Sequence, residues 1–273
     1  MDKVLKASTQ TASLILAAGR GSRMKGFEGN KTLLPLLPVK SPFQGSRPIL
    51  IHVLESLPPG PKAIVIHHRK EDVIKATRAF EVEYFEQGVL NGTGGALLAA
   101  RSFLEKKVQD KLIITMGDIP FVRRSTYCSL LEKLGARPLV VLGSKPQEKK
   151  QYGVVETEGE KVTRIIEWKY WSTYPRERQA QLRVCNSGIY AARRKELMRY
   201  LPLLAQKSHK VLKENDGRTL HIEEFFITDL VELMARDGLH VGCVIAEDED
   251  EVMGVDDFQS LIKAQEIFAR IER

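Results

Sequence analysis

The alternation of apolar runs with helix-length segments in the first half of this 273-residue chain constrains its fold most strongly. Apolar runs of strand length occupy residues 14–18, 63–66, 82–85 and 112–116. Between these runs, segments with helical spacing cover residues 49–57, 71–80 and 96–104. Because helices of this length can cross between parallel strands, the pattern predicts an α/β fold. We expect a three-layer, Rossmann-like mixed sheet, mostly parallel, with helices on both faces.

The second half has a different pattern. Residues 152–156 and 161–167 flank a glycine-containing turn and predict a β-hairpin, while residues 168–181 are aperiodic and predict a mobile loop over the site. Further strands are expected at 139–142, 182–191 and 239–246, and helices at 193–204, at 223–236 and from 258. Residues 206–219 are polar, and the acidic residues 247–251 are interpreted as a solvated turn. Residues 1–12 are interpreted as a lead-in, and 13–273 as a single domain.

Composition limits the partners of this domain. The net charge is +7, but the 42 Lys and Arg residues are scattered, without the aromatic-interleaved basic stripe of a nucleic-acid binder. We therefore expect phosphorylated small molecules and no nucleic acid. Cys128, Cys185 and Cys243 lie far apart, which favours reduced thiols in a cytoplasmic protein. No apolar stretch reaches membrane-spanning length, and the one near the amino terminus is too short for a signal peptide.

A glycine-rich basic loop follows the first apolar run. It has glycines at 19, 21, 26 and 29 and cations at 20, 23, 25 and 31. Glycines let backbone N–H groups converge on an anion, and Arg23 and Lys31 add a guanidinium and a point charge suited to a triphosphate. The loop lacks the P-loop spacing, and Met24 replaces the third glycine of the dinucleotide fingerprint. The alternative is an ordinary turn with surface cations.

Two later sites also fit a nucleotide and its metal. Glycines at 92, 94 and 95 surround Thr93 at the expected start of a helix, where free N–H groups can hold a base or a phosphate. Asp118 follows the run at 112–116, where open α/β sheets bind ligands, and its carboxylate suits Mg²⁺. The alternatives are a Thr-capped helix and an aspartate that closes a turn before Pro120.

Nine motifs now occur in a recognisable order. They are Leu16–Met24 with Lys31, Gln87, Gly92-Thr93-Gly94, Gly117-Asp118, Tyr152-Gly153, Ile166-Glu167-Trp168-Lys169, Asn186-Ser187-Gly188-Ile189, Phe226-Ile227-Thr228-Asp229 and Gly254-Val255-Asp256. From about residue 13 to its end, the chain resembles the nucleotidyltransferase domain of the sugar-nucleotide pyrophosphorylases. The resemblance is greatest to the N-acetylglucosamine-1-phosphate uridyltransferases, the amino-terminal half of a bifunctional bacterial enzyme.

The resemblance implies a role for each matching residue. The uridine pocket would be lined by Leu16, Ala17, Ala18 and Gly19, and the base would be read by Gln87, Gly92 and Thr93. Arg23 and Lys31 would hold the triphosphate and act in catalysis, and Asp118 and Asp256 would share Mg²⁺. The sugar would contact Gly153, Glu167, Asn186 and Thr228. UTP and a sugar 1-phosphate would be the substrates, with residues 13–145 as the nucleotide-binding half and 146–273 as the sugar-binding half with the closing helix.

Four departures from the family pattern lie around the sugar and the triphosphate. Asn30 replaces a proline, Met116 a tyrosine, Tyr170 an aspartate and Asp256 an asparagine. The reaction class is therefore better determined than the sugar. A relative that uses glucose 1-phosphate, CTP with an alditol phosphate, or dTTP remains open, as does a catalytically silent nucleotide-binding domain. The left-handed β-helix of the bifunctional enzymes has no counterpart here, so we expect no acetyl transfer. The sequence does not predict an oligomeric state.

Overall fold

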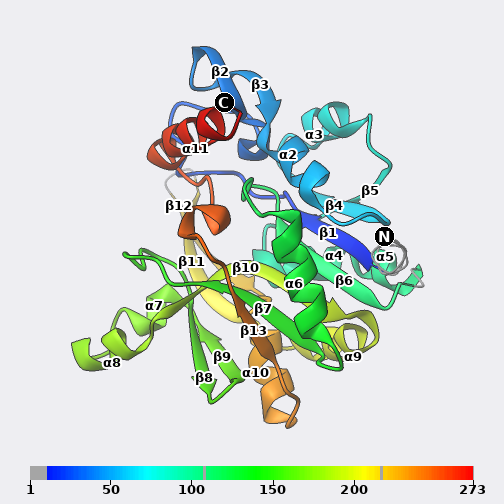
Figure 1. Ribbon diagram of the computed structural model, residues 1–273, viewed down its shortest axis with the longest axis vertical. Helices are drawn as coiled ribbons and strands as arrows, with labels where there is room; N and C mark the ends of the chain where they lie inside the picture. Colours follow the sequence, from blue (N-terminus) through cyan, green and yellow to red (C-terminus); the bar gives the residue numbers. More distant parts are fainter. Residues whose placement is uncertain (1–10, 107–108, 216–217, 273) are drawn as a thin grey trace.

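A mixed β-sheet forms the centre of the molecule (Figure 1), in a computed structural model that describes residues 11–106, 109–215 and 218–272. Along the sheet the order is β13 (Gly242–Ile245), β7 (Leu139–Ser144), β10 (Val184–Arg193), β6 (Lys111–Met116), β1 (Thr11–Leu16), β4 (Lys62–Ile66) and β5 (Val82–Glu86). Two further strands, β8 (Val154–Glu158) and β9 (Lys161–Ile166), form the expected hairpin and join the sheet through β10.

The strand directions confirm a mixed, mostly parallel sheet. β1 runs parallel to β4 and β6, β4 to β5, and β7 to β13. β10 is antiparallel to both of its neighbours in this path, β6 and β7. β10 therefore lies between two strands that come at least 40 residues earlier in the chain.

Helices cover both faces of the sheet, which confirms three layers (Figure 1). One face packs against α2 (Ile49–Ser56), α3 (Lys70–Thr77), α6 (Arg124–Leu134) and α11 (Phe258–Ile271). The other packs against α4 (Gly92–Ala99), α5 (Arg101–Lys106), α9 (Arg194–Leu204) and α10 (Asp229–Arg236). Successive side chains of a strand point to opposite faces, so Ile15 belongs to the first core and Leu14 and Leu16 to the second.

Residues 168–181, expected to be a mobile loop, contain two short helices, so the prediction that the segment is a loop is wrong. They are α7 (Trp168–Trp171) and α8 (Arg176–Gln181). Trp171 is buried against Val154, Ile166 and Cys185, and its Nε1 donates a hydrogen bond to the Tyr152 carbonyl at 2.8 Å. Helices this short do not produce a detectable hydrophobic period, which explains why the sequence pattern missed them.

Two antiparallel hairpins were also missed. β2 (Pro35–Ser41) pairs with β3 (Gln44–Pro48), and β11 (His209–Asn215) pairs with β12 (Arg218–Glu224). The second hairpin occupies most of the segment expected to be a polar connection, although residues 216–217 lie outside the described part. As a result, α10 begins at Asp229 and the predicted helix start at 223 is wrong. Both hairpins are rich in proline or charged residues, which obscures a strand pattern.

The acidic stretch 247–251 is not a fully solvated turn. It leads into the short 3₁₀ helix η2 (Glu249–Val252), where Glu251 is only 3% exposed. Its Oε1 accepts hydrogen bonds from the Arg123 amide at 2.9 Å and from the Thr126 hydroxyl. Glu251 thus satisfies donors at the start of α6, where helix N–H groups lack partners within the helix.

Three smaller expectations can be compared with the structure. β1 begins at Thr11, two residues inside the predicted lead-in, whose residues 1–10 lie outside the described part. Cys128, Cys185 and Cys243 are free thiols. Within the described ranges, no helix is both long enough and apolar enough to cross a bilayer.

Candidate active site

Asp118 and Asp256 lie at the same edge of the sheet although they come from distant parts of the chain. Asp118 follows β6, and its backbone carbonyl accepts a hydrogen bond from the Val255 amide at 2.9 Å. Asp256 is therefore held beside Asp118, just before α11. The next residue, Asp257, caps α11 by accepting from the Ser260 amide at 2.8 Å. The capped amino terminus of α11 thus helps to fix the position of the Asp256 carboxylate.

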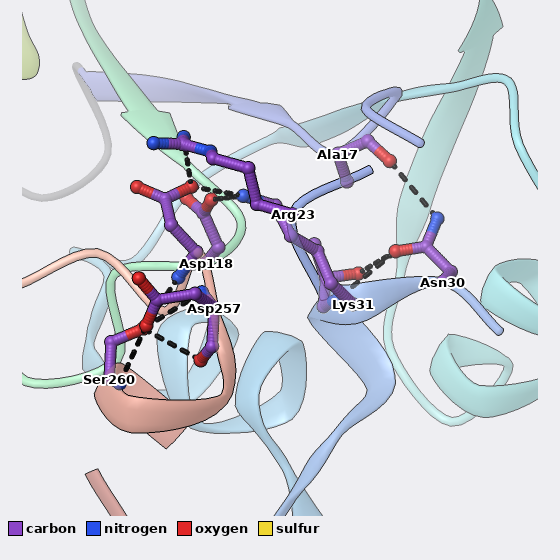
Figure 2. Close-up of polar contacts among 9 residues, drawn as sticks. Ala17, Arg23, Asn30, Lys31, Asp118, Asp257 and Ser260 are labelled. Carbon is purple, nitrogen blue, oxygen red and sulfur yellow. Dashed lines mark hydrogen bonds and ion pairs between the residues drawn. The ribbon is translucent and has the colours of Figure 1, made fainter. Parts of the chain in front are cut away.

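Two cations of the glycine-rich loop point at these carboxylates (Figure 2). Lys31 Nζ lies 2.7 Å from Asp256 Oδ1 and also contacts Asp118 Oδ2, and Arg23 Nη2 lies 2.9 Å from Asp256 Oδ1. Burial of Lys31 disfavours its charged form, but the two carboxylates outweigh burial and hold the pKa of the ammonium well above its usual value. Lys31 is thus a charged lysine in this arrangement.

The carboxylate pair fits Mg²⁺ only as part of a coordination shell. Among the described residues, no group of three or more His, Cys, Asp or Glu side chains could hold a metal ion by itself. Mg²⁺ bound with nucleotides typically takes one or two protein carboxylates and completes its shell with phosphates and water. Asp118 and Asp256 therefore fit a metal that arrives with a triphosphate, and do not form a complete protein site.

Asn30, which the sequence marked only as a departure, positions Lys31 (Figure 2). Its Nδ2 donates to the carbonyls of Ala17 at 3.2 Å and His68 at 2.8 Å. Its Oδ1 accepts from the Thr32 amide at 3.0 Å and so caps the 3₁₀ helix η1 (Lys31–Leu33). Asn30 is 1% exposed, so these contacts link the start of η1 firmly to the ends of β1 and β4.

The expected nucleotide residues form two groups at this edge. Leu16, Ala17, Ala18 and Gly19 lie at the carboxyl end of β1, where the Leu16 carbonyl accepts from the Gly117 amide at 2.9 Å. The first group is therefore adjacent to Asp118. No atom lies within 4 Å of the position that a Cβ on Gly19 would take, so its backbone is open to a ligand.

The second group follows β5, two strands away from β1. Gln87 is 4% exposed, and its Nε2 donates to Asn91 Oδ1 at 2.9 Å and to the Gly92 carbonyl at 3.0 Å. Gly92 has φ +90°, and a Cβ there would lie 2.5 Å from the Phe225 carbonyl oxygen. Thr93 Oγ1 accepts from the Ile227 amide at 3.2 Å. The loop after β5 therefore contacts the segment that leads to Thr228.

The four expected sugar residues form a continuous row. The Asn186 amide donates to the Gly153 carbonyl at 2.8 Å, and a Cβ on Gly153 would lie 3.6 Å from Glu167 Oε2. The Thr228 hydroxyl donates to Glu167 Oε1 at 2.8 Å. Burial raises the pKa of Glu167, while the bond from Thr228 opposes the shift.

The row is divided between two hollows. Glu167 and Thr228 line a groove of about 580 Å³. Asn186 instead lines a separate cavity of about 230 Å³ with Tyr152, and its side-chain Nδ2 donates to the Tyr190 hydroxyl at 2.9 Å. Tyr152 precedes Gly153 of the row, and burial and the nearby Asp256 carboxylate both raise the pKa of its hydroxyl. The row of expected sugar residues therefore approaches the carboxylate pair at Tyr152.

The MobA-like NTP transferase domain family matches residues 13–216. The chain belongs to this family. Its match covers the glycine-rich loop and Asp118, and continues through Gly153, Glu167 and Asn186.

Curated relatives extend the similarity to nearly the whole chain. It is 32% identical over 260 residues to the bifunctional protein GlmU of Sphingopyxis alaskensis, covering 93% of this chain and 51% of the relative. It is 33% identical over 260 residues to the GlmU of Novosphingobium aromaticivorans, covering 93% and 52%. The chain thus spans about half the length of the curated relatives it matches.

Solved structures show the same fold at low sequence identity. A putative glucose-1-phosphate thymidylyltransferase from Bacillus anthracis superposes with a TM-score of 0.68 at 19% identity, covering 94% of this chain and 95% of that one. A nucleotidyl transferase from Methanothermobacter thermautotroptrophicus superposes with a TM-score of 0.58 at 18% identity, covering 96% and 99%.

Sequence reasoning missed three residues of this MobA-like domain. Asn30 positions Lys31, Tyr152 lies between the sugar row and the carboxylates, and His209 lines the groove beside Glu167. Tyr152 was quoted only as part of a motif. No local signal marked His209, because it lies in the segment expected to be a polar connection.

Proposed function

We propose that this MobA-like domain is a Mg²⁺-dependent nucleotidyltransferase that joins UTP and N-acetylglucosamine 1-phosphate to give UDP-N-acetylglucosamine and pyrophosphate. The observation that carries the proposal is the convergence of Arg23 and Lys31 on Asp118 and Asp256 beside the sugar row. A triphosphate needs both sets of groups. The cations neutralise its phosphates, and the carboxylates bind the metal that accompanies it.

In the proposed reaction, an oxygen of the sugar phosphate attacks the α-phosphorus of UTP in line. A new P–O bond forms as the bond to the β-phosphate oxygen breaks, and pyrophosphate carries the electron pair away. Mg²⁺, when bound, would neutralise charge on the phosphates. Arg23 and Lys31 hold the triphosphate and stabilise the charge that develops on pyrophosphate. Positioning and charge neutralisation are sufficient for this transfer, so the proposal needs no nucleophilic side chain.

The nucleotide would bind across the ends of β1 and β5. We assign the uridine pocket to Leu16, Ala17, Ala18 and Gly19, and recognition of the base to Gln87, Gly92 and Thr93. The open backbone at Gly19 and the burial of Gln87 support this placement. Residues 13–145 would then be the nucleotide-binding half.

The sugar would bind along Gly153, Glu167, Asn186 and Thr228, in the half formed by residues 146–273. Glu167 and Thr228 meet at 2.8 Å and line an open groove, which supports their assignment. The assignment of N-acetylglucosamine rests on the motif resemblance, and the share of the GlmU relatives that the chain spans is compatible with it.

A second candidate is transfer to glucose 1-phosphate, or from dTTP or CTP. The fold shared with a putative glucose-1-phosphate thymidylyltransferase favours it, as do Met116 and Tyr170, which depart from the family pattern near the sugar. A catalytically silent nucleotide-binding domain is the third. The presence of both carboxylates and both cations at one edge argues against it.

Pyrophosphate release tests these candidates directly. The purified chain would be supplied with Mg²⁺ and each of UTP, CTP and dTTP, paired with N-acetylglucosamine 1-phosphate or glucose 1-phosphate. Turnover confined to UTP with N-acetylglucosamine 1-phosphate is the expected result. Turnover on another pair would preserve the chemistry and change the substrate, and no turnover with any pair would favour the silent domain.

A further inference from the structure

The groove beside Glu167 and Thr228 is enclosed by elements that the motifs did not connect. Glu167 and Thr228 line it together with Tyr170 of α7 and His209 at the start of β11. Phe226 and Asp229 complete the lining used here. If the proposed function is correct, this groove faces the sugar, so its walls decide which sugar fits.

One imidazole contacts three of these lining residues. His209 Nε2 lies 2.7 Å from Asp229 Oδ2, and Nδ1 lies 3.4 Å from the Tyr170 hydroxyl. The ring of His209 packs on that of Phe226 with centroids 4.8 Å apart. These residues come from β11, α7 and the segment that begins α10, so His209 links parts of the groove that the backbone does not join directly.

His209 is not the only partner of Asp229. Lys207 Nζ already lies 2.9 Å from Asp229 Oδ1, so Asp229 has a cationic partner without the imidazole. The contact with Tyr170 is long for a hydrogen bond, and Tyr170 is 44% exposed. The exposed hydroxyl therefore keeps hydrogen-bonding capacity for a ligand while it stays within reach of His209 Nδ1.

The groove is lined by many hydrogen-bonding groups, which suits a hydroxyl-rich ring. The Phe226 and Tyr170 rings add aromatic carbon to the lining, with Lys169 Nζ over each ring, 5.1 and 4.8 Å from the ring centres. Glu167, Asp229 and the Tyr170 hydroxyl offer hydrogen-bonding oxygen atoms. A pyranose presents C–H faces and hydroxyl edges that match both kinds of surface.

We propose that His209 determines sugar selectivity as a positioning residue, by holding the Asp229 carboxylate and the Tyr170 hydroxyl where they meet substituents of the bound sugar ring. This inference rests on the proposed function. His209 acts at the sugar end of the site, whereas the nucleotide end is built from the loops after β1 and β5. Its replacement should therefore weaken sugar recognition and leave nucleotide recognition unchanged.

The test compares binding of UDP-N-acetylglucosamine with binding of UDP by isothermal titration calorimetry on the full chain. The dissociation constant of UDP divided by that of UDP-N-acetylglucosamine measures how much the sugar adds to binding. We expect His209→Phe, which keeps a ring against Phe226 but loses both polar contacts, to lower this ratio about tenfold. We expect His209→Gln, which retains a polar end, to have a ratio between those of His209→Phe and the wild-type chain. The affinity for UDP should be the same in both variants as in the wild-type chain.

His221→Gln is the matched control. His221 lies in β12 of the same hairpin, is exposed, and does not line the groove. We expect it to bind both ligands as the unmodified chain does. If thermal melting shows that His209→Phe does not fold, Tyr170→Phe replaces it, because this change removes only the exposed hydroxyl.

Three results would overturn the inference. They are an unchanged ratio in the variants, an equal loss of affinity for both ligands, and a wild-type chain that binds UDP-N-acetylglucosamine no more tightly than UDP. The role of His209 and the proposed reaction can be refuted independently of each other. Turnover with UTP and N-acetylglucosamine 1-phosphate alongside an unchanged ratio would refute only the role of His209. A ratio lost in His209→Phe, in a chain that turns over no substrate pair, would support the role of His209 and refute the reaction.

Discussion

Lys31 and Asp256, which are 225 positions apart in the chain, form an ion pair of 2.7 Å, and the same ammonium contacts Asp118. Lys31 therefore occupies the space between the two carboxylates that we assign to the metal. An ammonium and a divalent cation compete for the same oxygens. Phosphates of an incoming nucleotide offer Lys31 another partner, so we expect metal and nucleotide to bind cooperatively.

Replacement of Lys31 tests this competition. Lys31→Gln removes the ammonium, so the two carboxylates should bind Mn²⁺ more tightly without nucleotide than they do in the wild-type chain. Free Mn²⁺ can be followed by electron paramagnetic resonance. Turnover should fall about 100-fold, because a charge that stabilises the departing pyrophosphate is lost. Lys25→Gln, an exposed change in the same loop, is the control, and equal Mn²⁺ affinity in all three proteins would contradict the competition.

Asp118→Asn and Asp256→Ala should each lower turnover by at least about 100-fold while the fold is retained, because the first removes the charge of a metal ligand and the second removes the ligand itself. Steady-state pyrophosphate release and a thermal melt measure the two effects. Asp257→Asn provides a matched control beside Asp256, since asparagine can also cap α11. A similar loss in Asp257→Asn, or full turnover in Asp118→Asn, would remove the metal assignment.

Glu167 should make stability depend on pH. Its pKa lies above the usual value of 4.5 because it is buried, so the folded chain binds this proton more firmly than the unfolded chain does. Stability from this group is then complete below pH 4.5 and is lost as pH rises through the folded pKa. Because glutamine has no such proton, the melting temperature of Glu167→Gln relative to wild type should increase as pH rises from 4.5 through the folded pKa and then level off.

Scanning fluorimetry across that range measures this difference. Glu160→Gln, in the exposed turn of the β8–β9 hairpin, controls for the loss of a carboxylate at the surface. A difference that does not change with pH for Glu167→Gln would show that burial does not shift this group.

Gly94 should not tolerate a side chain. A Cβ at this position would lie 2.7 Å from the carbonyl carbon of Phe225, so Gly94→Ala must displace the segment that leads to Thr228. We expect a loss of about 1–3 kcal/mol in the free energy of unfolding, measured by urea denaturation. Gly88→Ala, where no atom lies within 4 Å of the new Cβ, should be close to neutral. Equal stability of the two variants would mean that the backbone around Phe225 yields easily.

The sequence predicted the elements whose hydrophobic pattern is strong. The buried strands β1, β4 and β6 consist largely of apolar residues, and the residue at the end of a parallel strand faces the ligand edge, which led directly to Asp118. Asp256 could be placed only by resemblance. Nothing in its local sequence indicates the hydrogen bond from Val255 that brings it to Asp118.

The missed features share a physical cause. The hairpin of β11 and β12 places charged or polar residues at most of its positions, and α7 has four residues, so neither produces a clear period. Both elements line the groove beside Glu167. As a result, His209 could not be predicted, because its role depends on tertiary contacts between segments without a local signal.

The antiparallel strand β10 has a consequence for dissecting the molecule. It is contributed by residues 184–193, yet it pairs with β6 on one side and β7 on the other. A fragment that ends at residue 145 would leave both of those apolar strands with unsatisfied edges and would be prone to aggregate. The halves that we assign to the nucleotide and the sugar are thus parts of one folding unit, and we expect that the chain cannot be cut between them into two stable proteins.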